Sequence, residues 1–225
     1  MYLNKLIMKK TIILITLLFL SNVSWSQVTY GVRAGMSLSS YVIKPYFLFK
    51  PGVHVGGIVD VSISSKFSLV SGLYFADKGS RNEGEFIDDL SNEQYSFDAT
   101  INDYQIELPL LLTYKISLYN NLSLKPQIGL FASYTLYSEI NDTRVYVKNS
   151  IKGDPIHSSE NYNALDYNIY TFGMNIGLSV LYKNFSFTYS WDLGVMSDYM
   201  FARSYWDGHY PGANSCMFFS LGYNF

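Results

Sequence analysis

After residue 27, the chain alternates apolar residues with small or polar ones along one segment after another. Six apolar residues, from Val28 to Leu38, take every second position of residues 28–39, and six small or polar residues stand between them. Successive side chains of a strand point to opposite faces, so this period of two predicts strands with one apolar face and one polar face. The pattern recurs in residues 52–63, 67–78, 104–115, 124–136, 170–182, 185–195 and 217–225. The sequence therefore predicts an all-β fold of eight strands.

The lengths of these segments and of their connections favour a membrane barrel. The segments have 9 to 13 residues, whereas strands of soluble proteins average about 5–6 residues and a tilted membrane strand needs about 9–11. Short turns at 64–66, 120–121 and 183–184 alternate with connections at 40–51, 79–103, 137–169 and 196–215, which we expect to be long loops. Short turns at one end and long loops at the other are typical of outer-membrane barrels, which have an even number of strands and no open edge in lipid. We predict an eight-stranded antiparallel transmembrane up-and-down β-barrel, with a soluble sandwich or lipocalin-like barrel as the alternative.

The first residues have the pattern of a targeting segment. Lys9 and Lys10 precede an apolar run that ends at Leu20, and Ser24 and Ser26 form a small-x-small cleavage site. The run has about half of the roughly 20 residues that a spanning helix needs. We predict a cleaved signal peptide over 1–26 and a barrel domain over 27–225. An uncleaved N-terminal anchor is the alternative, and Met8 is a second candidate for the start of translation.

Aromatic residues gather at the ends of the predicted strands. They make up 17% of the chain, while charged residues make up 15%, against roughly 25% in soluble domains. With a periplasmic N-terminus, the outer ends of the strands carry Phe75, Tyr104, Tyr134 and Tyr170, and the inner ends carry Tyr30, Phe67, Tyr114, Tyr182, Phe185, Tyr223 and Phe225. Two aromatic belts with aliphatic residues between them indicate girdles at the two membrane interfaces. We therefore expect both termini in the periplasm and Phe225 as part of the signal that the barrel-assembly machinery reads.

The opposite face of the strands is rich in glycine and also carries charges of both signs. Its ionisable residues are Arg33, His54, Asp60, Lys78, Glu107, Lys115, Lys125 and Asp192. Side chains fill the interior of an eight-stranded barrel, and a buried charge needs a partner. We predict an interior polar network in which Arg33 pairs with Glu107 or Asp192, and no wide pore. A narrow channel for ions, protons or small solutes is the alternative.

Other functional classes find little support in the sequence. The net charge of −2 without a basic stripe gives no surface for nucleic acid, and the single cysteine, Cys216, excludes an intramolecular disulfide. Residues 83–103 are acidic, as in a solvated loop or a site for a basic partner or divalent cations. Residues 157–160 and 204–209 hold the residue types of rim enzymes that act on lipid A or peptides, but a triad is recognised by geometry and their spacing is not specific. We predict no enzymatic activity, no metal site and no cofactor.

Several segments resemble one known family. Residues 104–112 contain Glu107-Leu108-Pro109 followed by three leucines, which resembles a strand of the Bacteroidota outer-membrane β-barrel family that includes PorT. Residues 31–36, 72–79 and 221–225 resemble the first, third and closing strands of that family, with Ser37 where asparagine is usual. The resemblance covers about residues 28–225. It implies an outer-membrane barrel of about eight strands without catalytic residues and, for PorT itself, a part in type IX secretion and gliding.

These observations together predict a small outer-membrane barrel with a structural or partner-binding role in the cell envelope. Its expected partners are outer-membrane lipid and envelope or secretion-system proteins.

Overall fold

The computed structural model describes residues 28–41, 47–88, 93–148, 151–163, 170–197 and 214–225. The predicted signal peptide and residues 204–209 lie outside the described residues. Eight long strands are β1 (Val28–Tyr41), β3 (Lys50–Ser62), β4 (Phe67–Asp88), β5 (Glu93–Tyr114), β7 (Leu122–Lys148), β9 (Tyr170–Tyr182), β10 (Phe185–Ser197) and β11 (Asn214–Asn224). Three further strands are β2 (Phe47–Leu48), β6 (Ile116–Tyr119) and β8 (Ile151–Asn163). Among the described residues, no helix is long and apolar enough to cross a membrane.

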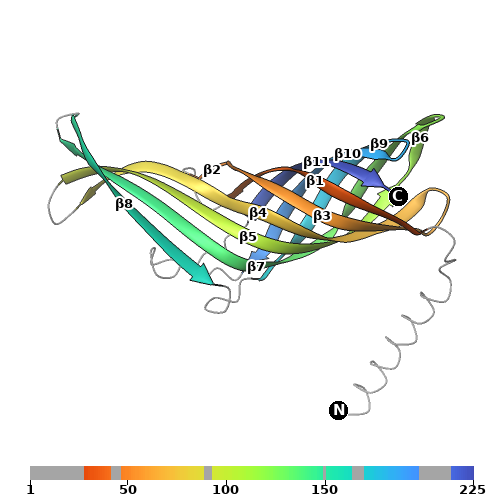
Figure 1. Cartoon of the computed structure of the whole chain (residues 1–225), viewed down its shortest axis with the longest axis horizontal. Coiled ribbons are helices and arrows are strands. Elements are labelled where there is room, and N and C mark those ends of the chain that lie inside the picture. Colours follow the sequence, from red (N-terminus) through yellow and green to blue (C-terminus); the bar gives the residue numbers. More distant parts are fainter. Residues whose placement is uncertain (1–27, 42–46, 89–92, 149–150, 164–169, 198–213) are drawn as a thin grey trace, which may run out of the picture.

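The eight strands named first form a closed ring, and β2, β6 and β8 lie outside it (Figure 1). Each pairs antiparallel with the next in the order β1, β3, β4, β5, β7, β9, β10 and β11. β11 returns to β1 over eleven residue pairs, from Gly31 opposite Asn224 to Tyr41 opposite Asn214. The N–H of Phe225 then donates a 2.8 Å hydrogen bond to the carbonyl of Tyr30. The predicted all-β, eight-stranded, antiparallel up-and-down barrel is confirmed.

The two faces of the barrel differ in polarity, as the alternation predicts. Apolar side chains such as Val32, Leu73 and Leu221 are exposed on the outer face. The side chains that are buried most completely are mainly polar, and the largest of them are Lys78 and Gln105. This arrangement is inverted relative to a soluble protein, since lipid instead of an inner core covers the apolar face.

The apolar outer band has the height of a membrane. On β5 it runs from Tyr114, whose ring lies 4.9 Å from that of Phe67, to Tyr104, whose ring lies 6.2 Å from that of Phe75. Ten residue steps of about 3.4 Å along a strand tilted by about 40° give a height of about 26 Å. This matches the band of about 25 Å that outer-membrane barrels present to lipid.

The prediction of long loops at 79–103 and 137–169 is wrong for the described parts of these segments. β4, β5 and β7 continue far beyond the aromatic rows, and β8 pairs with β7, so the described parts of these segments are strands (Figure 1). We call this four-stranded sheet the extension; it comprises 79–88 of β4, 93–103 of β5, 137–148 of β7 and all of β8. The regular alternation of polarity is lost here on β4, β7 and β8, and with it the sequence signal for a strand. On β5 it continues through Phe97, Ala99 and Ile101, but with the parity of the inward residues of the barrel.

The opposite end of the barrel also differs slightly from the prediction. β6 pairs with the start of β7, Ile116 lying opposite Leu124, so the turn expected at 120–121 is the tip of a short hairpin. The turns at 64–66 and 183–184 link the strands that we predicted.

Candidate functional site

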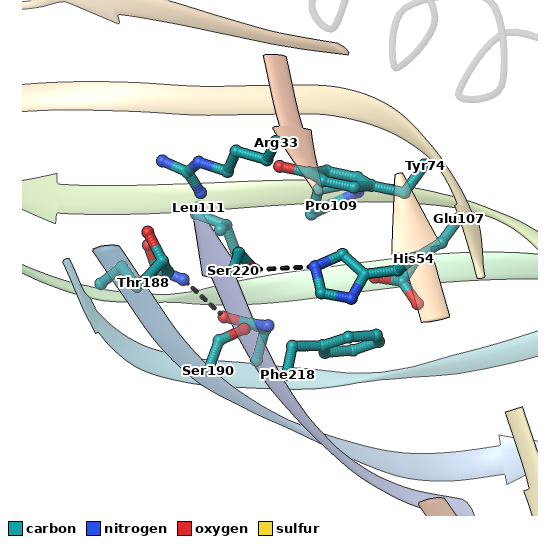
Figure 2. A pocket seen from close by; sticks show the side chains of 12 residues that line it. Arg33, His54, Tyr74, Glu107, Pro109, Leu111, Thr188, Ser190, Phe218 and Ser220 are labelled. Atoms are coloured by element: carbon teal, nitrogen blue, oxygen red, sulfur yellow. Dashed lines mark hydrogen bonds between the residues drawn. The ribbon is translucent and has the colours of Figure 1, made fainter. Parts of the chain in front are cut away.

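A small cavity lies inside the barrel, among side chains of β1, β3, β4, β5, β7, β9, β10 and β11 (Figure 2). Its volume of about 30 Å³ is room for roughly two water molecules. Arg33, His54, Tyr74 and Glu107 line it together with Phe218. The cavity therefore brings together residues that are up to 187 positions apart in the chain, from Arg33 to Ser220.

His54 is held on two sides. Its Nε2 lies 2.7 Å from the hydroxyl of Ser220, and its ring meets the ring of Phe218 edge-on at a centroid distance of 4.8 Å. The side chain is 4% exposed, and its Nδ1 has no hydrogen-bond partner among the described residues. His54 is thus a positioned, buried side chain with one ring nitrogen left for water.

The main buried charge of the barrel is Lys78. Its Nζ donates to a carboxylate oxygen of Glu107 and, at 3.2 Å, to Oδ2 of Asp192. The amide of Asn175 donates a 2.5 Å hydrogen bond to the other oxygen of Asp192. The rings of Phe131 and Phe218 lie 5.0 and 5.1 Å from Nζ, within the range of a cation–π contact. We call Lys78, Glu107 and Asp192 the buried ion cluster.

The predicted pairing of Arg33 with Glu107 or Asp192 is wrong. Lys78 takes both carboxylates, and Arg33 forms no ion pair with any described residue. Arg33 instead lies beside Tyr74 at the cavity, and its Nε has no hydrogen-bond partner among the described residues (Figure 2). The relative stagger of β1, β4, β5 and β10 decides which cation reaches which carboxylate, and alternation along a single strand carries no information on stagger.

The remaining predicted interior charges lie outside the cavity. Lys125 and Asp60 form a 2.5 Å ion pair closer to the end of the barrel where β1 begins, next to a 2.8 Å hydrogen bond between Ser68 and Thr113. Lys115 is exposed, and its assignment to the interior network is a correction. β5 ends at Tyr114, so the alternation that would turn Lys115 inward stops one residue before it.

One interior ion pair has no counterpart in the prediction. The Nζ of Lys50 lies 2.5 Å from Oδ1 of Asp77 and also donates to the carbonyl of Lys78 at 3.1 Å. Alternation on β4 places Asp77 on the outward face. Lys50 lies an even number of residues before His54 on β3, so both side chains point inward. A predicted strand beginning at residue 50 and not at 52 would have placed Lys50 inside the barrel.

The predicted inner girdle lies on the outer face, at the end of the barrel where β1 begins and β11 ends. Tyr30, Tyr182, Phe185 and Phe225 are more than half exposed. The rings of Tyr223 and Phe185 lie 5.3 Å apart, and those of Tyr223 and Phe225 lie 5.4 Å apart. At the other end, the rings of Tyr104 and Tyr137 and those of Tyr134 and Tyr170 make similar pairs at 5.9 and 5.0 Å.

The rim residue His157 has no catalytic surroundings in the described part of the chain. It is exposed on β8, and its Nδ1 lies 3.1 Å from the hydroxyl of Thr143. No described carboxylate makes a hydrogen bond to it, so the orienting acid of a triad is missing there. Among the described residues, no three histidines, cysteines or carboxylates gather as metal ligands.

Comparison with known proteins identifies the family to which this chain is related. Residues 21–200 match the family model described as outer membrane protein beta-barrel domain. The chain belongs to this family. As an outer-membrane barrel it presents its apolar band to lipid and encloses its polar side chains, which explains the inverted polarity of the two faces.

Solved structures of other outer-membrane barrels are similar to this one. Ail, the attachment invasion locus protein of Yersinia pestis, is 10% identical, with 88% of this chain and 99% of that chain covered and a TM-score of 0.45. Neisserial surface protein A is 10% identical over 89% and 100% of the two chains, with a TM-score of 0.39. The protease OmpT from Escherichia coli is 12% identical over 90% and 98%, with a TM-score of 0.41. Among curated protein sequences there is no match.

Proposed function

We propose that this outer-membrane barrel binds a partner in the cell envelope and that the extension is its contact surface. The observation that carries the proposal is the change of polarity above the aromatic rows. Glu83, Asp98, Thr143 and His157 form one row across the four strands of the extension, each lying opposite the next. A row at barrel level, Leu69, Leu112, Ile128 and Ile176, is apolar throughout. The polar face of the extension that carries this row of four lies beyond the apolar band and is available to another macromolecule.

The interior of the barrel supports a binding role over a transport role. The buried ion cluster crosses the lumen from β4 to β5 and β10, and the cavity beside it has room for only about two water molecules. Moving an ion through this lumen would require separation of buried ion pairs, which is costly. We expect no stepwise conductance in planar bilayers, and reproducible single-channel events from the purified barrel would favour a narrow channel instead.

The orientation that we propose places both termini in the periplasm and the extension outside the cell. Its support is that the turns at 64–66 and 183–184 share one end of the barrel with Tyr30 and Phe225, while the strands elongate at the other end. Short periplasmic turns are the rule in barrels of this kind. A signal peptide over 1–26 agrees with this route. The resemblance of residues 104–112 to a PorT-like strand favours envelope or secretion proteins, such as those of type IX secretion, as partners.

Removal of the extension tests the proposal without removing the barrel. Asn82 lies opposite Ala99, and Asn141 lies opposite Ser159, so a two-residue Asn-Gly turn can replace 83–98 and another can replace 142–158. The matched control shortens the β6–β7 hairpin at the other end by replacing 118–122 in the same way, because Ser117 lies opposite Ser123. Heat-modifiable migration on gels reports whether each barrel has formed.

We expect both variants to assemble, and only the variant without the extension to lose function in secretion, envelope integrity or surface binding. A strain in which the shortened barrel supports all three activities at the level of the unaltered protein would refute the proposal.

A further inference from the structure

The extension ends in a strand, β8, with one edge that no described strand occupies. β8 pairs with β7 along a single edge, from Asn163 opposite Tyr137 to Ile151 opposite Lys148, and the described residues place no strand on its other edge. In an edge strand, the N–H and C=O groups of every second residue point away from the paired strand, and they can form hydrogen bonds with an added strand. We propose that this edge binds an extended basic segment of an envelope protein as a fifth strand of the extension. The inference rests on the proposed function and deepens it.

The two halves of β8 differ in how well they accept a new strand. Residues 151–155 end in Pro155, which has no N–H and blunts an edge. Residues 156–163 contain no proline. Ile156, His157, Ser158 and Ser159 are all exposed, and none carries a formal negative charge or a lysine side chain that would repel an approaching backbone. The proposed docking edge is therefore 156–163, the half of β8 closer to the barrel.

The charge of the extension selects the chemistry of the partner. The four strand segments that form it contain ten acidic and four basic residues, a net charge of −6. The whole chain has a net charge of only −2, so the acidity is concentrated at this end. A field of this sign attracts a basic segment and repels an acidic one, mainly through the rate of association.

The same charge argues against a second copy of the barrel as the occupant. Two copies joined through β8 would bring two sheets of net charge −6 side by side. Like charges of this size disfavour the dimer unless salt screens them over a Debye length of about 8–10 Å. The other edge of the extension, on β4, is partly covered, because β2 pairs with Arg81 and Asn82. Beyond them only six residues of β4, 83–88, remain on that edge, fewer than the eight residues of 156–163.

The experiment measures binding of a synthetic strand to the full barrel in lipid nanodiscs. The probe is a fluorescent peptide of alternating lysine and valine, about eight residues long to match 156–163. Its matched control alternates glutamate and valine. Fluorescence anisotropy gives the dissociation constant at low and at high salt.

Two proline variants identify the edge. Adjacent residues of a strand point their N–H groups to opposite edges, so Ser158→Pro and Ser159→Pro remove one N–H that bonds β7 and one that faces outward. Ser158→Ala and Ser159→Ala keep both groups and serve as controls. We expect the lysine peptide to bind the unaltered barrel and both alanine variants equally, and at least one proline variant about tenfold more weakly while its barrel still assembles.

Equal binding by all four variants would overturn the inference, because it would show adsorption to acidic side chains without strand addition. Equal binding of the lysine and glutamate peptides would also overturn it, since charge would then not select the partner. A barrel that dimerises through β8 and excludes the peptide would replace the proposed occupant by a second copy. None of these results alters the outcome of removing the whole extension, so the proposed function can stand when this inference fails.

Discussion

Replacement of Lys78 by methionine is the most direct test of how the barrel interior is stabilised. Lys78 is 1% exposed and is the only ion-pairing cation that Glu107 and Asp192 have among the described residues. Methionine keeps most of the volume and the contacts with Phe131 and Phe218, so the substitution removes chiefly the charge. Two buried carboxylates are then left facing each other without a cation.

The magnitude follows from the geometry. At 3.2 Å and an effective dielectric constant of about 20, the attraction between Lys78 and Asp192 amounts to about 5 kcal/mol, which is the gross term before desolvation is counted. Removing one partner of a buried ion pair typically destabilises a protein by about 3–5 kcal/mol. We expect the free energy of unfolding of Lys78→Met to fall by this amount. Replacement of all three charges, in Lys78→Met with Glu107→Gln and Asp192→Asn, should cost less than the single substitution.

Urea unfolding of the barrel in phospholipid vesicles, followed by tryptophan fluorescence and by heat-modifiable migration, measures both variants. The reasoning fails if the single variant unfolds within about 1 kcal/mol of the unaltered barrel. It also fails if the triple variant is less stable than the single one, because the cost would then come from lost packing and not from unpaired charge.

Three other predictions concern barrel closure, strand crowding and the extension. Deletion of Phe225, which is 74% exposed in the girdle and whose N–H bonds Tyr30, should lower outer-membrane levels more than any substitution in the extension; normal levels on immunoblots would contradict this. Gly35→Ala should prevent assembly because its Cβ would lie 1.9 Å from the carbonyl oxygen of Phe219, whereas Gly57→Ala, whose nearest neighbour is 4.0 Å away, should assemble normally on heat-modifiable gels. The hydrogen bond from Arg81, with its charge, holds the pKa of Asp98 below the ordinary 3.8. Asp98 therefore contributes fully to the stability of the extension above about pH 3.8, and this contribution is lost as the pH falls through the lowered pKa. An NMR titration of the Asp98 carboxyl group checks this, and the titration midpoint should rise in Arg81→Gln.

The strands of the barrel were predictable because lipid and lumen impose opposite polarity on alternate residues. All eight segments correspond to strands of the ring, and most of their ends agree within about three residues. The segments at 79–103 and 137–169 were misassigned for the same reason. Above the aromatic rows the regular alternation is lost on β4, β7 and β8, and on β5 it changes parity, so the strands there do not continue the pattern of the barrel.

Contacts between side chains within the lumen were harder to predict from the sequence. Parity placed Lys78, Glu107 and Asp192 on the inner face, yet the choice of Lys78 over Arg33 as their cation depends on how β1, β4, β5 and β10 are staggered around the ring. Lys115 was misplaced because the alternation of side chains between the two faces applies only within a strand, and β5 ends at Tyr114.

The sequence by itself thus determined the class of the fold, the number of strands, the lipid-facing residues and the aromatic rows, because each follows from the period of one strand in a two-sided environment. Only the tertiary structure decided which buried charges meet, how far the strands continue beyond the apolar band and that no described strand pairs with the second edge of β8. These properties depend on the register between strands, and register is set by hydrogen bonds between residues far apart in the chain.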